Sequence, residues 1–153
     1  MKKFLIIGNP NNVCHKVGFP LIKDNKMWLG YKYGNTTFIN SDKVVKICWY
    51  TNLTVSKRNE LLNLTKHYNP VDYPNYDNYD AINVDRTQDI PRDYYGNMGV
   101  PVSFMDKYNP NQFEIIDAIG RYSALGKTAE SDGKYLTDVN GIHKYARIII
   151  KRK

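Results

Sequence analysis

The segment Phe4-Leu5-Ile6-Ile7-Gly8-Asn9-Pro10 decides the fold class that the sequence predicts. Its first four residues form a continuous apolar run, and Gly8-Asn9-Pro10 marks a sharp turn directly after it. Short apolar runs of this kind are typical of strands that are buried on both faces, as they are in parallel α/β sheets. We therefore expect an α/β fold in which Phe4 to Ile7 is a buried strand.

Patterns up to residue 67 add a hairpin, a strand and a helix. Gly34-Asn35 separates two β-prone runs, residues 27–33 and 36–39, and predicts a hairpin turn between them. Val44 to Thr51 is rich in Val, Ile, Trp and Tyr, which favours a strand. Residues 56–67 are expected to form a helix, because three leucines supply an apolar face and the segment starts with a serine, a good N-cap.

Beyond residue 67 the composition changes to Tyr, Asn, Asp and Pro, which predicts a long loop over residues 68–80. Phe113 to Ile119 is expected to be a strand. The clearest local signal is Asn140-Gly141, which lies between two β-prone runs, residues 135–139 and 142–150. This dipeptide favours a two-residue hairpin turn, since both of its residues tolerate positive φ. We therefore expect a β-rich C-terminal region with a terminal hairpin.

Length and composition limit the class of protein. With 153 residues, 42% of them hydrophobic, the chain is long enough to bury a core without a disulfide or metal. Its apolar runs are far shorter than the ~20 residues of a membrane span, and the N-terminal run is too short for a secretory signal. Cys14 and Cys48 lack metal-ligand spacing. We expect a cytoplasmic globular protein with no membrane partner and no metal site.

Charge is distributed unevenly within the net total of +7. Residues 1–66 carry eleven Lys and Arg against three acids, and residues 118–153 carry eight against three. Residues 67–117 carry three against nine. Two basic segments would suit a polyanion, because Lys and Arg attract phosphates and release their counterions. An ordinary solvated basic surface explains the pattern equally well.

The Tyr-rich loop and nearby cations supply the candidate DNA contacts. Exposed tyrosines can stack on unpaired bases, and Lys or Arg can contact phosphates. The acids of the same loop repel phosphates, however, and the tyrosines could instead pin the loop onto the domain. From this chemistry we select six DNA-binding candidates: Lys57, Arg58, Tyr76, Tyr79, Arg86 and Arg92.

Catalytic and cofactor motifs are absent or incomplete. Asn9-Pro10-Asn11-Asn12 lacks the second proline and the aromatic residue of the Asn-Pro-Pro-aromatic motif of amino-methyltransferases, so we expect a strand-terminating turn there. No glycine-rich turn follows a strand, and there is no P-loop. Glu114, Asp117 and the triplet Asp132-Gly133-Lys134 allow a Mg²⁺-dependent nuclease as a further alternative.

Several blocks of sequence follow one another over nearly the whole chain and together carry a resemblance. They are residues 4–9, 19–23, 28–30, 48–53, 76–82 and 89–91, the longest block 99–116, and the ending at residues 140–141 and 145–148. This series resembles the C-terminal part of the EcoRI-type adenine-specific DNA methyltransferases of restriction–modification systems.

The resemblance implies transfer of a methyl group from S-adenosylmethionine to the N6 amine of a DNA adenine, which such enzymes extrude from the base stack. In that family, the cofactor-binding strands and the Asn-Pro-Pro-aromatic motif precede the strand that resembles Phe4 to Ile7. We therefore expect S-adenosylmethionine to be bound mainly by an upstream half, and this chain alone to be inactive. No catalytic or cofactor-binding residue is assigned within it.

The implied fold is a partial, Rossmann-like mixed sheet of the methyltransferase type. Residues 1–67 would be the second half of the α/β core, and residues 68–153 the Tyr/Asp-rich arm with a β-rich DNA-recognition region, in one compact unit. Double-stranded DNA is the expected partner. An upstream methyltransferase half or a second copy would add to it, because exposed strand edges favour pairing. The alternatives are a non-catalytic DNA-binding module and, third, the nuclease.

Overall fold

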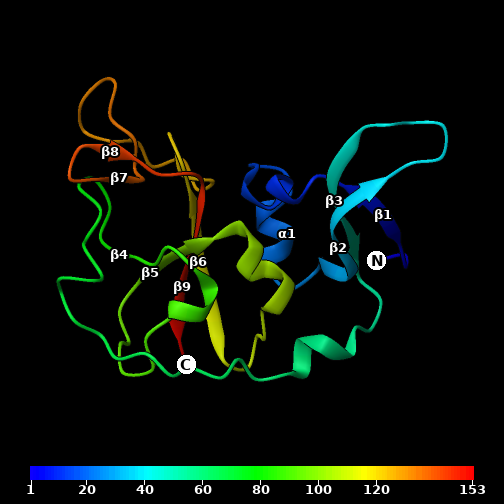
Figure 1. Ribbon diagram of the computed structural model, residues 1–153, viewed down its shortest axis with the longest axis horizontal. Helices are drawn as coiled ribbons and strands as arrows, with labels where there is room; N and C mark the ends of the chain where they lie inside the picture. Colours follow the sequence, from blue (N-terminus) through cyan, green and yellow to red (C-terminus); the bar gives the residue numbers. More distant parts are fainter.

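The computed structural model describes residues 1–153 and builds them mainly from strands (Figure 1). One sheet has the order β1-β3-β2, a second has the order β4-β5-β9-β6, and β7 pairs with β8 alone. The strands are β1 (Leu5–Gly8), β2 (Trp28–Thr37), β3 (Val44–Thr51), β4 (Ile82–Asn83), β5 (Met98–Pro101), β6 (Phe113–Ile119), β7 (Asp138–Val139), β8 (Ile142–His143) and β9 (Arg147–Arg152). The helices are α1 (Phe19–Lys23) and the 3-10 helices η1 (Pro10–Cys14), η2 (Ser56–Asn59), η3 (Thr87–Asp89) and η4 (Val102–Lys107).

The fold is mixed, as expected, but richer in strands and poorer in helix than the α/β prediction. The one α-helix, α1, has five residues and lies between the two larger sheets (Figure 1). All strand pairs are antiparallel except β4 with β5. Only β2–β3 and β7–β8 are joined by short turns, and the other antiparallel pairs bring together strands that are far apart in the sequence.

The expectation that Phe4 to Ile7 is a buried strand is wrong. The strand β1 forms, but it pairs antiparallel with β3 and lies at the edge of its sheet. Leu5, Ile6 and Ile7 are 52%, 56% and 55% exposed. An apolar run becomes a buried strand only where other elements cover it, and β1 has a single hydrogen-bonded neighbour.

The first predicted hairpin exists, but its turn lies elsewhere. β2 continues through Gly34 and Asn35, which pair with Ile47 and Lys46 of β3. Gly34 has a φ of 124°, yet it stays within β2. It lies next to a shift in the pairing register between β2 and β3. The turn therefore falls at residues 38–43, which extend away from the body of the molecule (Figure 1). The predicted strand Val44 to Thr51 is confirmed.

The helix expected over residues 56–67 is limited to η2, and the chain after it is extended or irregular. The side chain of Gln112 explains part of this difference. Its Oε1 accepts from the Leu62 N–H at 2.8 Å, and its Nε2 donates to the Leu62 carbonyl at 2.7 Å. These two bonds satisfy backbone groups that a helix would otherwise have paired.

The long loop over residues 68–80 is confirmed as lacking regular secondary structure, and its tyrosines attach it to the domain. Tyr73 and Tyr76 are only 6% and 4% exposed. The ring of Tyr68 lies 4.7 Å from that of Tyr94, centroid to centroid. These three tyrosines therefore attach the loop to the domain and are not exposed for stacking on bases.

The C-terminal hairpin is confirmed, although its arms are short. Asn140 and Gly141 have φ values of 50° and 78° and connect β7 to β8, as a two-residue turn of this type requires. The chain then leaves the hairpin, and β9 inserts between β5 and β6 in the larger sheet. Ile148, Ile149 and Ile150 of β9 are buried there.

One hydrophobic core joins the two regions that the sequence predicts. Phe19, Leu29 and Tyr50 belong to the same cluster of buried side chains as Phe104 and Ile150. The two sheets therefore share one interior. None of the helices is long and apolar enough to cross a membrane.

Candidate nucleic-acid interface

Four surface hollows lie next to one another in a series, in which each shares lining residues with the next. The first and second share Leu62 and Lys107, the second and third share Asp85 among others, and the third and fourth share Cys14 and His15. Their volumes are about 270, 410, 800 and 470 Å³ in that order. We call the series the groove and its third and largest member the central hollow.

The central hollow lies where the two large sheets meet. One side comes from the turn after β1, with Tyr33 of β2 and Lys46 of β3, and the other from the start of η4 and residues 145–147. The Asn9 side chain holds the turn, since its Oδ1 accepts from the Asn11 N–H at 2.8 Å. The strand-terminating turn expected at these residues therefore forms and becomes a wall of the groove.

A hydrogen-bond network around Arg147 lies at the boundary between the second and central hollows. Arg147 is only 6% exposed and donates to Asn83 at 3.4 Å and to Asp85 at 3.3 Å. Asn83 in turn donates to Asp85 at 2.9 Å and accepts from the Tyr76 hydroxyl at 2.9 Å. The bond from Asn83, with the nearby Lys144 and Arg147 charges, lowers the pKa of Asp85 and keeps its carboxylate ionised.

Cations outnumber free acids along the groove. Lys57 is paired with Asp106, and Asp85 is held by Arg147 and Lys144. Four further cations line the hollows without an ion pair: Lys16, Lys46, Lys107 and Arg121. The groove thus offers several free positive charges to an anion, while two of its three acids are already neutralised.

Two aromatic rings and one thiol add to the central hollow. The Lys46 ammonium lies 5.2 Å from the centroid of the Tyr33 ring, and burial raises the pKa of the Tyr33 hydroxyl to about 12. Tyr145 is 90% exposed. Burial also raises the pKa of the Cys14 thiol to about 12, so Cys14 is protonated at neutral pH and not a reactive thiolate.

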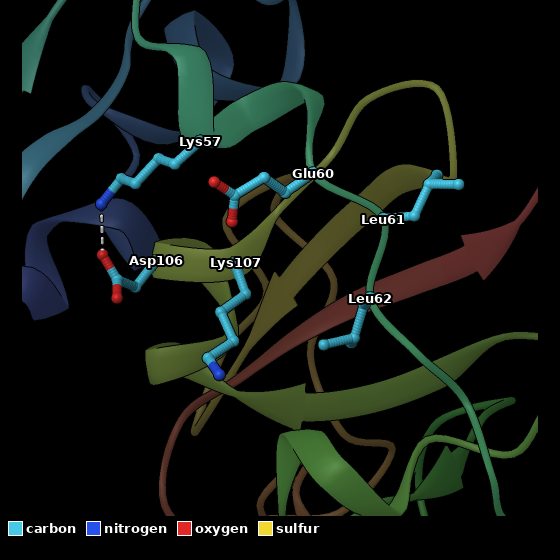
Figure 2. Close-up of a pocket in the computed structure, with 6 residues that line it drawn as sticks. All are labelled: Lys57, Glu60, Leu61, Leu62, Asp106 and Lys107. Carbon is cyan, nitrogen blue, oxygen red and sulfur yellow. Dashed lines mark hydrogen bonds and ion pairs between the residues drawn. The ribbon is translucent and has the colours of Figure 1, made fainter.

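Two of the six predicted DNA-binding residues line the groove. Figure 2 shows Lys57 of η2 directed at Asp106 of η4 in the first hollow, with Glu60 and the Lys107 side chain beside this pair. Arg86 lines the second hollow and is paired with Asp89 at 2.7 Å. Both cations are therefore at the predicted interface, although each already has an acidic partner.

The other four predicted residues lie away from the groove. The guanidinium of Arg58 lies 4.2 Å from the centroid of the Trp28 ring. Tyr76 is buried in the Arg147 network, so its ring is not available to a base in this structure. The Tyr79 hydroxyl donates to Asp117 at 3.1 Å. Arg92 is exposed and free of such contacts, and its role in DNA binding stays a prediction.

The sequence reasoning missed the free cations of the groove, although its charge count contained a signal. Lys16 and Lys46 come from the first basic segment, and Arg121 comes from the last. The fold brings these two segments together, whereas neither forms a local motif that could have been identified alone.

The residues of the nuclease alternative are not brought together. No group of three His, Cys, Asp or Glu side chains lies close enough to hold a metal ion. Asp117 is fully buried and accepts from the Tyr79 hydroxyl and the Ala118 N–H. Its carboxylate therefore already has hydrogen-bond partners inside the fold.

Comparison with known proteins identifies the family. The family described as adenine-specific methyltransferase EcoRI matches residues 1–44 and 39–153. The chain is 41% identical to the Type II methyltransferase M.EcoRI of Escherichia coli, across 99% of this chain and 51% of that protein. It is 34% identical to M.MgeORF184P of Mycoplasma genitalium and 30% identical to M.MpnI of Mycoplasma pneumoniae, across 99% of this chain and 57% of each. No solved structure matches it.

The matches make the family of the chain definite. The chain belongs to the EcoRI-type adenine-specific methyltransferase family, as its blocks of sequence predict. It spans about half the length of the curated relatives that it matches, which agrees with the prediction of a C-terminal portion.

The residues of the central hollow do not fit S-adenosylmethionine, the cofactor that the family resemblance implies. That cofactor carries an ammonium, a sulfonium and two ribose hydroxyls, groups that a free carboxylate would bind. The one acid of the central hollow, Asp85, is already bound by Asn83, Lys144 and Arg147. No step of methyl transfer is therefore assigned to these residues.

Proposed function

We propose that this chain is the DNA-engaging portion of an adenine-N6 DNA methyltransferase and that duplex DNA lies along the groove. The observation that carries the proposal is the set of free cations Lys16, Lys46, Lys107 and Arg121, which come from distant parts of the sequence and line one groove. Positive side chains in a row contact successive phosphates and release their counterions, which supplies much of the affinity for DNA.

The remainder of the methyltransferase joins at the free edge of β1. There the sheet β1-β3-β2 continues into a larger, Rossmann-like sheet, whose other strands carry the S-adenosylmethionine site and the Asn-Pro-Pro-aromatic motif. The unpaired edge of β1 and the exposure of Leu5, Ile6 and Ile7 support this arrangement, since an open apolar edge favours strand addition. Alone, the chain binds DNA but transfers no methyl group.

DNA binding is tested by fluorescence anisotropy with a labelled duplex over a range of salt concentrations. We expect the affinity to fall as salt rises. Replacing Lys16, Lys46, Lys107 or Arg121 with alanine weakens binding and lowers the slope of log K against log salt by about 0.9 for each phosphate that the protein no longer neutralises. A matched control replaces Lys2, Lys3, Lys43 or Lys66, which are exposed lysines outside the groove, and leaves the slope unchanged. Equal effects in the two sets would contradict the groove as the DNA site.

Methyl transfer is tested by adding the portion of M.EcoRI that this chain does not match, expressed as a separate polypeptide. We expect transfer of a labelled methyl group to duplex DNA only when both polypeptides are present. Transfer by this chain alone would show that it builds a complete active site.

A DNA-binding module without catalytic function is the second candidate. It is supported by the same unpaired cations of the groove, which would bind DNA whether or not a catalytic portion is present. This candidate predicts the same salt-dependent binding but no methyl transfer with any added methyltransferase portion, so the complementation assay separates the two functions.

A further inference from the structure

The second hollow of the groove collects polar side chains that can form hydrogen bonds with the edges of DNA bases. It has a volume of about 410 Å³ and shares lining residues with the first hollow and with the central hollow, so DNA that lies along the groove must pass it. Two of its lining residues are carboxamides, Asn63 and Gln88. Carboxamides suit adenine, because one amide can donate to N7 and accept from the N6 amine in the major groove.

The fold itself uses neither of these two amides. Asn63 and Gln88 are exposed, and their side chains have no hydrogen-bond partner within the protein. By contrast, the amides of Asn83, Asn109 and Gln112 all bind other parts of the chain. The donors and acceptors of Asn63 and Gln88 are therefore free for a ligand in the groove.

Gln88 is the middle residue of η3, a short helix that is anchored by the residues around it. The Tyr73 hydroxyl donates to the Asp89 carbonyl at 2.7 Å, and Arg86 Nε donates to the Asp89 carboxylate at 2.7 Å. The next residue, Ile90, is fully buried. Because the backbone is held while the Gln88 side chain is exposed, placing its amide against a base costs little backbone entropy.

Asn63 belongs to an extended segment whose neighbouring residues face the interior. Leu62 and Leu64 pack against the hydrophobic core, and the Gln112 side chain binds both backbone groups of Leu62. Successive side chains of an extended chain point to opposite sides, so Asn63 points outward. The contact with Gln112 therefore also directs this amide into the groove.

Lys107 lines the same hollow and supplies a cation beside the two amides. Phosphate contacts fix the position of a protein on the duplex, whereas contacts with base edges distinguish sequences. The one carboxylate that lines this hollow, Asp85, is paired with Arg147 and Lys144. The hollow thus combines a cation for the backbone of DNA with free amides for its bases.

We propose that Asn63 and Gln88 determine which DNA sequence the protein binds, by reading adenines in the major groove while Lys107 holds a nearby phosphate. This inference rests on the proposed function, in which duplex DNA lies along the groove. The cations of the groove bind DNA of any sequence, since every phosphate is alike, and the two amides add a preference for particular bases.

The test selects duplexes bound by the full chain from a library with a randomised central segment, and sequencing gives the base preference at each position. We expect the unmodified chain to favour adenine at particular positions by at least about fivefold, the lower limit for one bidentate contact. Gln88→Ala and Asn63→Ala should each abolish the preference at one position and keep it elsewhere. Asn111→Ala changes an exposed amide outside the groove and should keep every preference.

Gln88→Glu tests the same contact by a change of preference instead of a loss. A carboxylate accepts from the N4 amine of cytosine but has no donor for adenine N7, so we expect cytosine to replace adenine at the position that Gln88→Ala affects. If the unmodified chain binds duplex DNA without base preference, or if the preference survives in all amide variants, this inference fails and the groove remains. If the unmodified chain binds no duplex, the proposed function itself fails.

Discussion

At the scale of single residues, Arg147 shows how this fold keeps a buried charge. Its guanidinium is almost fully buried, and three acceptors surround it: the Asn83 side chain, the Asp85 carboxylate and the Tyr145 carbonyl. A buried charge is tolerated when it is paired and its hydrogen bonds are made. The same contacts hold the residues that separate two hollows of the groove, so one network stabilises the fold and shapes the site.

The Asp85 carboxylate should make stability depend on pH in the acid range. Its pKa is lowered in the folded state, so its contribution is present above the unfolded value of about 3.9 and is lost as the pH falls through the lower, folded value. Asp85→Asn should lower stability at pH 7 by about 0.5–1 kcal/mol, a small effect because the carboxylate is exposed to solvent. The difference from the unmodified chain should be smaller at an acid pH, below the unfolded pKa, than at pH 7.

Urea denaturation at the two pH values measures this effect. Asp132→Asn, a change of an exposed acid without an ion pair, should leave the pH dependence as it is. A difference between Asp85→Asn and the unmodified chain that persists unchanged in acid would mean that the network does not depend on the charge of Asp85.

At the scale of elements, β1 is the strand whose sequence and surroundings disagree most. Its apolar run is typical of a strand between two neighbours, yet it pairs only with β3 and leaves its other edge open. Natural proteins usually protect such edges with charges, prolines or bulges. β1 has none of these within Leu5–Gly8, which is why we place the remainder of the methyltransferase sheet there.

Charges on β1 should therefore block partner binding without unfolding the chain. Leu5 and Ile7 alternate along the strand and share one face, and both are more than half exposed, so replacing both with lysine removes little buried area. We expect the double variant to unfold at nearly the same temperature but to lose binding to the unmatched portion of M.EcoRI. Analytical ultracentrifugation measures both this complex and any self-association.

Val44→Lys provides the control, because Val44 is 62% exposed but lies in β3, away from the open edge. It should leave the complex intact. If Val44→Lys abolishes binding and the double variant in β1 does not, the partner surface lies at the β2–β3 end of the sheet.

At the scale of the whole molecule, one core holds the two large sheets together. Phe104 of η4 is fully buried and lies 5.3 Å from Phe113 of β6 in an edge-to-face arrangement. The helix η4 also contacts β2, η1 and β9. Because β2 and β9 belong to different sheets, η4 connects the two, and the chain should fold as a single cooperative unit.

Phe104→Ala should destabilise both sheets together. Removing a fully buried phenylalanine costs about 3–5 kcal/mol through reduced burial and the cavity that remains. We expect calorimetry to show one unfolding transition in the unmodified chain and one in the variant, shifted to lower temperature. Two separate transitions, with only one of them shifted, would show that residues 1–67 and 68–153 are independent domains.

Local sequence alone determined the features that depend on neighbouring residues. The Asn140-Gly141 turn forms because both residues tolerate positive φ, and Val44–Thr51 and Phe113–Ile119 are strands because their residues favour extended backbone. The family was also evident from the order of its sequence blocks.

The tertiary structure alone decided what is buried and what is brought together. Residues 60–67 are not helical in part because the side chain of Gln112, distant in sequence, binds the backbone of Leu62. The apolar run at β1 is exposed because no second strand pairs with it. Tyr76 is buried because its ring packs with Leu136 and Ile149, while its hydroxyl joins the Arg147 network. Three of the four free cations of the groove, Lys16, Lys46 and Arg121, come from the two basic segments, and Lys107 comes from the acidic segment between them. Burial and long-range contacts depend on residues far apart in the chain, and local sequence patterns therefore do not predict them.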